Sequence, residues 1–518
     1  METEGIKVST TEPELFEVTE NMRQEMEEAR ERAASTIASI DYNEIKDTSY
    51  NFRDYDQAQT FFITVSKAGF IEDGHPVVII DKIIEGLNLD SLYSKYSDEG
   101  NPAYHPKMML KILFYAYYCR IMTSRTIWNN VINRSDFIYL SAGQVPNFRT
   151  INLFRMKHLD NLPNLFAQIV MLCKELDMIG FEHMAIDGEK IQANANFRNS
   201  KNLKQVKAEL ERVEKGMQKL LEQEVNEHIN MAKIDKRLNT LQKKMKKLKG
   251  LQGQLEEIGD EKKRINTTDP DAPVMRRKDG TSRPAYNHQT VRDDKCGVVT
   301  AVDTTLSGDK PEDLISLVEQ SIENTGEHHE KVTADSGFQS YANLEKMEER
   351  TEDFYVPDTR FVESLKKAEE QKKFGQEQFL KNGDDTYQCP NGRTMKYKQT
   401  ITTPDGGTAV IYECEDCENC PLKPRCTKST IRQIAIDTRE PLREEMREKL
   451  KSDEGRETYI KRQGLIESIH GDDQKNGGWT QHLLRKQLKA RGEFMLLRIA
   501  HNLRCIVKNR GEEVLAYG

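Results

Sequence analysis

Apolar residues recur at every third or fourth position over much of the first third of the chain, a spacing that predicts amphipathic helices. Pro106 stands at a favoured first helical position and precedes a broad apolar face. A second helix is expected to begin at Ser124, a candidate N-cap, and a third to cover residues 151–162. Residues 49–175 are therefore predicted to form an all-helical domain. Its short helices fit a helix-turn-helix DNA-binding module and a plain bundle equally well.

Beyond residue 180 the pattern changes to an alternation of strands and helices. Strands are predicted at residues 183–192, with a turn in the middle, and at 286–292, 298–304, 331–335 and 353–357. Helices are predicted at residues 311–324 and 341–350 and from about 455 to 470. This order resembles that of a ribonuclease-H-like fold, which is an α/β core built on a mixed five-stranded sheet. We expect residues 176–518 to form such a catalytic domain.

Two insertions interrupt that series. Residues 198–264 carry apolar side chains in steps of three and four, with a break near residues 226–235, which predicts an antiparallel helical hairpin with a coiled-coil seam. The hairpin segment 201–264 holds 17 basic and 11 acidic residues. Because charge runs usually face water, a solvated structural arm is favoured over direct DNA contact, and dimerisation is a further alternative. Residues 375–430 form the second insertion, which is rich in cysteine.

The chain has nine cysteines, and five of them lie close together in the second insertion: Cys389, Cys414, Cys417, Cys420 and Cys426. Short turns between paired thiolates aim two sulfurs at one ion, which is the arrangement that tetrahedral Zn²⁺ needs. We predict a structural, zinc-ribbon-like site that uses four of the five, with the choice between Cys420 and Cys426 open. The alternative is a set of reduced thiols without metal. The other four cysteines are expected to be small buried hydrophobes.

Composition excludes several classes of protein. The chain has 518 residues, of which 36% are hydrophobic and 31% charged, so it can bury a sizeable core. Its longest strongly apolar stretch, residues 108–119, is too short to cross a bilayer, and the polar amino end does not resemble a signal peptide. We expect a cytoplasmic, nucleoid-associated protein without a membrane partner.

The formal net charge of −8 becomes informative when it is divided along the chain. Residues 1–48 contain 13 acidic and 5 basic side chains, so this acidic arm, with an amphipathic helix expected near residues 21–40, accounts for the whole excess. Residues 475–510 hold nine basic side chains against the single Glu493. Local patches decide phosphate binding, so an acidic sum does not exclude a nucleic-acid partner. We hypothesise that the arm folds over the basic surface and competes with DNA.

Three carboxylates stand where a ribonuclease-H-like sheet would bring acids to one edge. Asp187 lies in the first predicted strand, Asp335 follows the fourth, and Glu467 lies in the late helix. Each of them alone is more often a turn or surface residue. Together they could hold two divalent cations, Mg²⁺ or Mn²⁺, because hard cations take carboxylate oxygens and keep open positions for water and phosphate.

The helix that carries Glu467 also carries Tyr459 and Arg462. An arginine guanidinium suits two-point contact with a phosphate. The alternative is a salt bridge from Arg462 that orients Glu467.

These residues resemble a known family. The matching segments are residues 185–194, 268–272, 286–290 and 333–338, the cysteine-rich insertion, and the helix with Tyr459, Arg462 and Glu467. From about residue 50 to 507 the chain is similar to DDE-type transposases of prokaryotic insertion sequences, in particular the group numbered eleven-eighty-two, related to the transposases with a Tyr-Arg-Glu-Lys signature.

The resemblance implies that Asp187, Asp335 and Glu467 are the metal-binding catalytic triad. The reaction would be strand cleavage at the ends of the element, followed by attack of the freed 3′ hydroxyl on target DNA. Partners would be double-stranded DNA, as terminal inverted repeats and as target, and a second copy of the chain. The residues expected to bind DNA are Tyr459, Arg462, Lys475, Arg485, Lys486, Lys489 and Arg491.

The chain departs from the family around Lys475, which stands one place later than the signature lysine, after Asp472 and Asp473. Two other functions stay open. One is an inactive descendant that binds DNA as a regulator, and the other is a ribonuclease-H-like nuclease that cuts DNA without joining it.

Overall fold

The computed structural model describes residues 71–72, 74–96, 102–224, 231–277, 280–306, 314–359, 361–362, 374–383 and 385–516. The chain divides into residues 1–64 and 65–518, and every described residue belongs to the second unit. The acidic arm predicted for residues 1–48, including its helix, lies outside the described residues. In the part of the chain that is described, no helix is both long enough and apolar enough to cross a membrane.

The first described segment is helical, as its periodicity predicts. Its helices are α3 (Pro76–Glu85), α4 (Asp90–Tyr93), α5 (Pro106–Tyr118), α6 (Ser124–Asn133), α7 (Ser135–Ser141), α8 (Phe148–Lys157) and α9 (Leu162–Glu175). Pro106 is the first residue of α5, as expected.

One predicted N-cap and one predicted helix start were wrong. Helix α6 begins at Ser124, as expected, but its N-cap is Thr123 rather than Ser124, because the Thr123 side chain accepts the Thr126 N–H. The third predicted helix begins at Phe148 instead of residue 151, because Asn147 caps it by accepting two backbone N–H groups.

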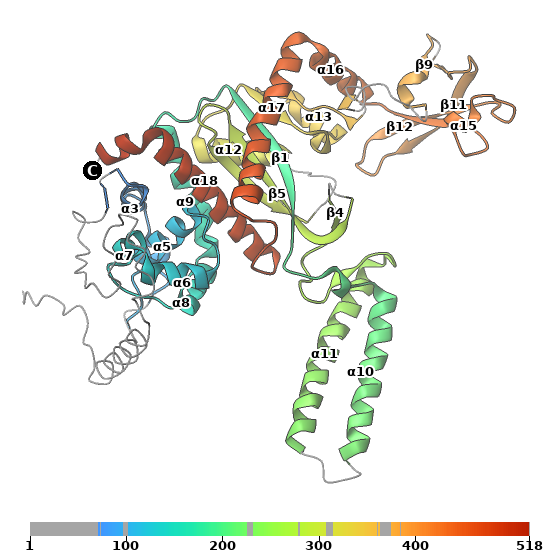
Figure 1. Ribbon diagram of the computed structural model, residues 1–518. Helices are drawn as coiled ribbons and strands as arrows, with labels where there is room; N and C mark the ends of the chain where they lie inside the picture. Colours follow the sequence, from blue (N-terminus) through green and yellow to red (C-terminus); the bar gives the residue numbers. More distant parts are fainter. Residues whose placement is uncertain are drawn as a thin grey trace, which may run out of the picture. The chain divides into compact units, whose positions relative to one another are not determined.

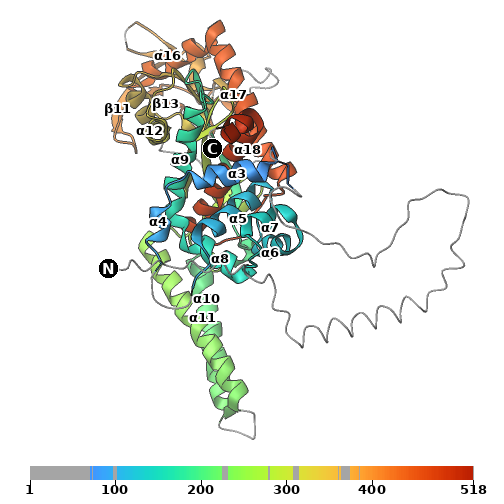
Figure 2. The same cartoon turned by 90° about the vertical axis from the view of Figure 1, so that its left-hand side faces the viewer.

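The last helix of the chain shares a core with these first helices. Helix α18 (Gln487–Ala516) packs against α3, α5 and α9, and its buried Phe494, Ile499 and Leu503 join the same apolar cluster (Figures 1 and 2). Arg498 of α18 is fully buried, and Arg504 donates to the carbonyl oxygens of Tyr117 and Tyr118. Some of the basic side chains of residues 475–510 are thus buried or hydrogen-bonded within the protein, which the charge count alone cannot show.

The central sheet is mixed. Its strands are β1 (His183–Gln192), β5 (Ser282–Asp293), β6 (Val299–Thr305), β7 (Lys331–Ala334) and β8 (Asp353–Tyr355), in the order β6-β5-β1-β7-β8. β1 pairs antiparallel with β5 and parallel with β7, and β7 pairs parallel with β8. A sixth short strand, β4 (Val274–Arg276), pairs with the start of β5, so the predicted count of five was low by one.

The turn predicted inside the first strand was wrong. β1 runs without interruption through Gly188, which pairs with Gln289 of β5. An Asp-Gly dipeptide favours a turn in isolation, but hydrogen bonds to a neighbouring strand hold this one extended.

Helices cover both faces of the sheet. Because alternate strand residues point to opposite faces, Met184 and Ile186 of β1 join a core with α12 (Leu314–Thr325), whereas Asp187 reaches α17 (Asp453–Gly471) (Figure 1). Helices α13 (Tyr341–Glu348) and α16 (Glu440–Lys451) pack together, and α16 also contacts α17 and β8. The sequence pattern did not predict α16, which buries Met446 and Leu450 and also turns charged side chains toward the protein.

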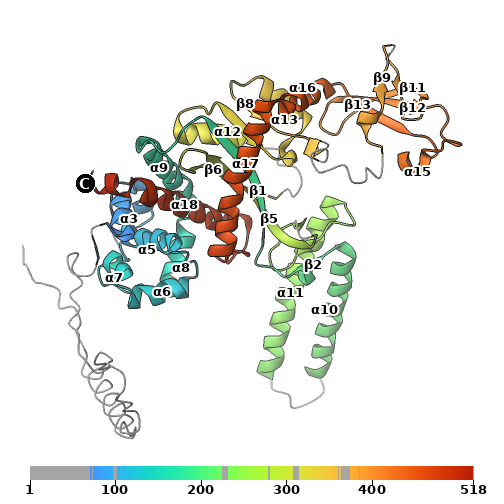
Figure 3. The ribbon, with the colours of Figure 1, turned by 45° about the horizontal axis from the view of Figure 1, so that its top comes forward.

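Two inserted segments form substructures outside this sheet. Helices α10 (Leu203–Glu224) and α11 (Met231–Ile258) lie side by side, with β2 (Ser200–Lys201) paired to β3 (Ile265–Asn266) at their base (Figure 3). The cysteine-rich segment forms a five-stranded antiparallel sheet that the pattern did not predict. Its strands are β9 (Leu380–Lys381), β10 (Tyr387–Gln388), β11 (Thr394–Thr402), β12 (Thr408–Cys414) and β13 (Gln433–Asp437), with the short α15 (Lys423–Cys426) between the last two.

Candidate active site and its supports

Two predicted carboxylates lie next to each other where the pairing of two adjacent strands ends. The parallel register of β1 and β7 ends with Ile186 opposite Ala334, and the residues that follow are Asp187, within β1, and Asp335, directly after β7. Parallel pairing brings residues that are far apart in the sequence to the same level of a sheet, so these two become neighbours at its edge. Asp187 is only 7% exposed and Asp335 is half-buried. This edge therefore concentrates negative charge where water has limited access.

The backbone after β7 is shaped by Asp335 itself. Its carboxylate accepts the Gly337 N–H at 2.9 Å and caps a 3₁₀ turn, η4 (Ser336–Phe338), which the buried Phe338 anchors. A Cβ at Gly337 would lie only 3.0 Å from Asp335 Oδ1. The segment is thus a turn, and this turn orients the Asp335 carboxylate.

Helix α17 places Arg462 and Tyr459 over this pair. Arg462 Nη1 lies 3.7 Å from Asp187 Oδ1, and its guanidinium carbon lies 5.4 Å from the centre of the Tyr459 ring. The Nε of Arg462 is buried and has no hydrogen-bond partner. Burial raises the pKa of Tyr459, against the opposing effect of Arg462 and with a smaller contribution from Asp335, so the phenol keeps its proton. The site therefore holds a cation and a hydroxyl donor beside two acids.

The third predicted acid, Glu467, lies in α17, five residues beyond Arg462, and its side chain is outside the described part of the structure. The ion pair that the structure gives to Arg462 is with Asp187.

The helix after Glu467 ends in a π-helical turn, η6 (Asp472–Asn476), which contains the exposed Lys475. The two acids that stand before Lys475 are both paired with arginines. Arg120 donates to Asp472 at 2.6 Å, and the buried Arg498 of α18 donates to Asp473. Their negative charge is therefore compensated within the protein.

The π-turn also changes where Lys475 falls around the helix. Eight residues separate it from Glu467, and in a regular α-helix this would rotate it by about 80° beyond two full turns. A π-turn absorbs one extra residue. The backbone position of Lys475 is then equivalent to seven α-helical steps, about 700°, which is close to two full turns. By register, Lys475 thus returns to the side of the helix on which Glu467 lies.

Sequence reasoning missed Glu189. It lies two residues after Asp187, on the same face of β1, is 8% exposed, and accepts a hydrogen bond from Gln474 of the π-turn. Burial lowers the pKa of Arg498 to about 9, and Glu189 opposes that effect. Residues two apart in a strand point to the same face of the sheet, so the spacing of Asp187 and Glu189 is the signal that could have identified Glu189.

The other predicted DNA-binding residues lie around the start of α18. Arg485 is exposed and donates to the Asn194 carbonyl oxygen at 3.0 Å, and Arg491 lies 3.4 Å from Asp303. Lys486 precedes α18 and Lys489 lies in its first turn. The contacts of Arg485 and Arg491 are thus with Asn194 and Asp303 rather than with the residues around Asp187.

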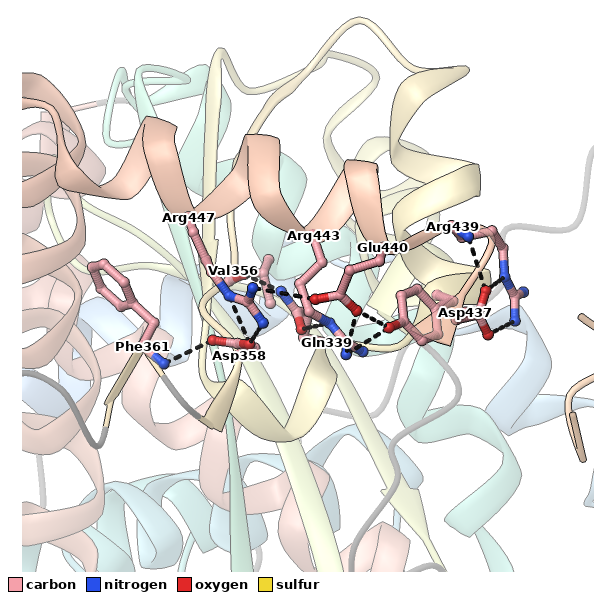
Figure 4. Close-up of polar contacts among 10 residues, drawn as sticks. Gln339, Val356, Asp358, Phe361, Asp437, Arg439, Glu440, Arg443 and Arg447 are labelled. Carbon is pink, nitrogen blue, oxygen red and sulfur yellow. Dashed lines mark hydrogen bonds and ion pairs between the residues drawn. The ribbon is translucent and has the colours of Figure 1, made fainter. Parts of the chain in front are cut away.

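A charged network fixes helix α16, which leads directly into α17 (Figure 4). Arg447 Nε donates to Asp358 at 2.9 Å, and Arg443 donates to the Tyr341 hydroxyl at 2.8 Å and to the Gln339 side chain at 3.1 Å. Burial would raise the pKa of Asp358, but the hydrogen bonds from Arg447 and the Phe361 N–H, together with the nearby arginine charges, outweigh it and lower that pKa. These contacts hold the start of α17 against the sheet and so help to position Arg462.

The five clustered cysteines line one cavity of about 20 Å³, roughly the space of one water molecule or ion. All are free thiols. Cys414 and Cys417 are buried in an apolar cluster to which Cys389 and Cys426 also belong, whereas Cys420 only lines the cavity. Burial, and then Cys417, raise the pKa of the Cys414 thiol to about 12.

Within the described residues, no three His, Cys, Asp or Glu side chains are arranged so that they could hold a metal ion. The cavity thus gathers the predicted zinc ligands without closing a coordination shell. The same holds for the sheet edge, where Asp187 and Asp335 are the predicted ligands whose side chains are described.

Comparison with known families finds transposase domains at both ends of the described chain. Residues 66–157 match the family described as "Transposase domain (DUF772)", and residues 388–507 match the family described as "Transposase DDE domain". The second match includes all five clustered cysteines, Tyr459, Arg462, Glu467 and Lys475, while Asp187 and Asp335 lie outside both matches. Both matches support a DDE-type transposase of an insertion element. Neither a curated protein nor a solved structure matches the chain.

Proposed function

We propose that this protein is a DNA transposase that cuts strands at the ends of its element and joins the freed 3′ hydroxyl to target DNA, as in cut-and-paste transposition. The observation that carries the proposal is the register of β1 and β7, which makes Asp187 and Asp335 neighbours beneath Arg462 of α17. Two family matches to transposase domains support it.

The proposed core is ribonuclease-H-like. In support, β1 lies at the centre of the sheet order β6-β5-β1-β7-β8. It runs antiparallel to β5 and parallel to β7. The proposed domains are a DNA-binding helical domain over residues 49–175 and a catalytic domain over residues 176–518, with inserts at 198–264 and 375–430.

Asp187, Asp335 and Glu467 would hold two Mg²⁺ or Mn²⁺ ions. The donors fit, because the described pair offers hard carboxylate oxygens at one partly shielded edge. When bound, such ions supply activation of the attacking oxygen and stabilisation of the leaving oxygen in an in-line displacement.

The protein's own cations would hold the DNA strand. Arg462 is suited to this role because its buried Nε has no partner and its side chain is stacked against Tyr459. The protonated hydroxyl of Tyr459 is a second donor. Lys475 would act from the same side of the helix as Glu467, since the π-turn compensates for its late place in the sequence.

More distant contacts to the DNA backbone are assigned to four residues at the start of α18: Arg485, Lys486, Lys489 and Arg491. A homodimer is proposed for the synaptic complex, because two element ends must be held together. Sedimentation of the chain with and without end DNA tests this, and a one-to-one complex would contradict it.

For the cysteine-rich sheet we propose a structural Zn²⁺ held by Cys389, Cys414, Cys417 and Cys426. The shared cluster of these four thiols and the ion-sized cavity support the choice, and leave Cys420 as the spare. Metal analysis should give one zinc per chain, lost in Cys417→Ser and kept in Cys420→Ser. Loss in both variants would show that Cys420 is a ligand.

The decisive experiment incubates the full chain with Mg²⁺, DNA that carries the terminal inverted repeats, and a supercoiled target. We expect cleavage that exposes a 3′ hydroxyl, followed by joined products. Asp335→Asn should bind the DNA as well as the original chain and cut nothing, while Asp160→Asn, at a carboxylate paired with Lys95, should cut normally.

Other outcomes separate the remaining functions. Cleavage without joining would identify a nuclease. Absence of cleavage by the original chain, with DNA binding equal to that of Asp335→Asn, would identify a DNA-binding descendant without catalysis.

A further inference from the structure

The two helices of the hairpin share one apolar seam but differ in charge. The seam is formed by Val206, Leu210 and Val213 of α10 and by Leu248, Leu251 and Leu255 of α11. Helix α10 has five basic and five acidic residues, whereas α11 has eight basic and three acidic residues. A hairpin that only needs to be solvated has no use for this asymmetry, because a balanced surface is equally soluble.

Four exposed lysines lie on the side of α11 that faces away from the seam. By helical register, Lys236, Lys243 and Lys247 fall about 200° to 240° from the seam residue Leu241, and Lys246 falls about 140° from it. They extend over twelve residues, and the eleven steps from Lys236 to Lys247 cover about 16 Å along the helix axis. We call these four residues the lysine strip.

The described acidic residues of the hairpin that form ion pairs do so with lysines outside the strip. The ion pairs given for the hairpin join Lys207 to Glu256 at 2.9 Å, Lys244 to Glu209 at 2.8 Å, and Lys201 to Glu209. Within the described residues, no carboxylate lies within ion-pair distance of any lysine of the strip. Four positive charges are thus available to an outside partner.

The neighbours of the strip indicate which kind of partner fits. Asn239 and Thr240 are exposed between the lysines, and Gly250 continues the same face. Protein interfaces are built around apolar or aromatic anchors, which this face lacks. A row of lysine charges among polar side chains suits instead a polyanion whose negative charges are regularly spaced. Duplex DNA is such a polyanion, with about one negative charge per 1.7 Å of its axis.

We propose that the lysine strip binds the phosphate backbone of double-stranded DNA without reading its sequence. The proposal rests on the proposed function, which brings DNA to this chain. Each lysine contacts a phosphate as a compact charge on a flexible stem, so the strip adds affinity and not specificity. Helix α10, which is balanced in charge, serves to hold α11 through the seam.

The test compares two variants of the full chain that lose the same charge. The strip variant carries Lys236→Gln, Lys243→Gln, Lys246→Gln and Lys247→Gln. The control variant removes four exposed basic side chains from α10 and carries Lys204→Gln, Arg212→Gln, Lys215→Gln and Lys219→Gln. Glutamine keeps a good helix propensity, and circular dichroism should show the same helix content in both.

Binding to a duplex of arbitrary sequence is followed by fluorescence anisotropy over a range of NaCl concentrations. Release of counterions from four phosphates should contribute about 3 to 4 to the slope of log Kd against log salt. We expect the strip variant to lose about that much slope and to bind at least tenfold more weakly at 0.1 M NaCl, and the control variant to keep the original slope. An unchanged slope in the strip variant, or an equal loss in both variants, would overturn the proposal.

Two further outcomes have a defined meaning. Poly-L-glutamate that binds the strip more tightly than duplex DNA of equal charge would assign the strip to an acidic protein and overturn the proposal. The failure of the proposed function can be told apart from the failure of this inference. If the original chain cuts no DNA but the strip variant still loses salt dependence of binding, the inference about the strip stands. If the original chain cuts DNA and the strip variant keeps the original slope, only the inference about the strip is refuted.

Discussion

Replacing Arg462 by glutamine probes the electrostatics beside Asp187. The two charged groups are 3.7 Å apart, and their side chains are only 16% and 9% exposed. A guanidinium in that place opposes a divalent cation on Asp187 but attracts a DNA phosphate. We therefore expect Arg462→Gln to bind Mn²⁺ more tightly when DNA is absent, and yet to lose DNA cleavage.

The size of the effect follows from the geometry. A hard cation contacts a carboxylate oxygen at about 2.1 Å, so one held by Asp187 Oδ1 would lie at most about 6 Å from Arg462 Nη1. At that separation a double and a single positive charge repel by about 1.4 kcal/mol in a medium as polar as water, and by more where water is partly excluded. Because about 1.4 kcal/mol is a factor of ten in affinity, the Kd for Mn²⁺ should fall at least tenfold.

The assay is a titration of the full chain with Mn²⁺, in which the free ion is measured by electron paramagnetic resonance. Arg485→Gln, at an exposed arginine bonded to Asn194, is the matched control and should leave the Kd unchanged. Asp187→Asn should weaken binding strongly. A Kd that is unchanged or higher in Arg462→Gln would refute the reasoning, because it would show that Arg462 does not face the bound cation.

Three other predictions concern stability and the acidic arm. Burial opposes ionisation of Glu352, but hydrogen bonds from Arg350, His328 and the backbone, with the charge of Arg350, together outweigh it and lower the pKa of Glu352 from 4.5 to about 2. Its carboxylate thus stabilises the fold above pH 4.5, and about 3 kcal/mol should be lost as the pH falls from 4.5 to 2, a dependence that Glu352→Gln should abolish in acid-unfolding curves. Gly455→Ala should lower the Tm, at a cost of about 1 to 3 kcal/mol, because the new Cβ would meet backbone of the preceding helix, whereas Gly464→Ala, where space is open, should be tolerated. Deletion of residues 1–48 should tighten non-specific DNA binding at low salt, and an unchanged affinity would remove the idea of a competing arm.

Features that repeat locally could be predicted from the sequence. Steps of three and four give the helices α5, α10 and α11, because an amphipathic helix needs only its own residues to define a buried side. The five strands of the central sheet were located for the same reason. The details of helix starts were missed where a side-chain cap decides the boundary: Thr123 caps α6 in place of Ser124, and α8, capped by Asn147, starts three residues early.

Helix α16 and the strands of the cysteine-rich sheet escaped prediction. The buried side of α16 is marked by Leu442, Met446 and Leu450, which recur at every fourth position. Beside them, Arg443 and Arg447 also face the protein, where Asp358 and Tyr341 from other segments stabilise them. Such a charged face looks solvated in the sequence alone, since the acids that pair with it are distant in the chain.

The sequence by itself supplied the groups that the proposed chemistry needs: three acids, a tyrosine and an arginine ahead of the last acid, and closely spaced thiols. Only the tertiary structure decided which of these groups meet. The parallel register of β1 and β7 makes Asp187 and Asp335 neighbours, and packing of α18 into the first helices turns Arg498 into the buried partner of Asp473. The reason is physical: periodicity records how a segment buries its own face, whereas ion pairs and strand registers depend on segments that only folding brings together.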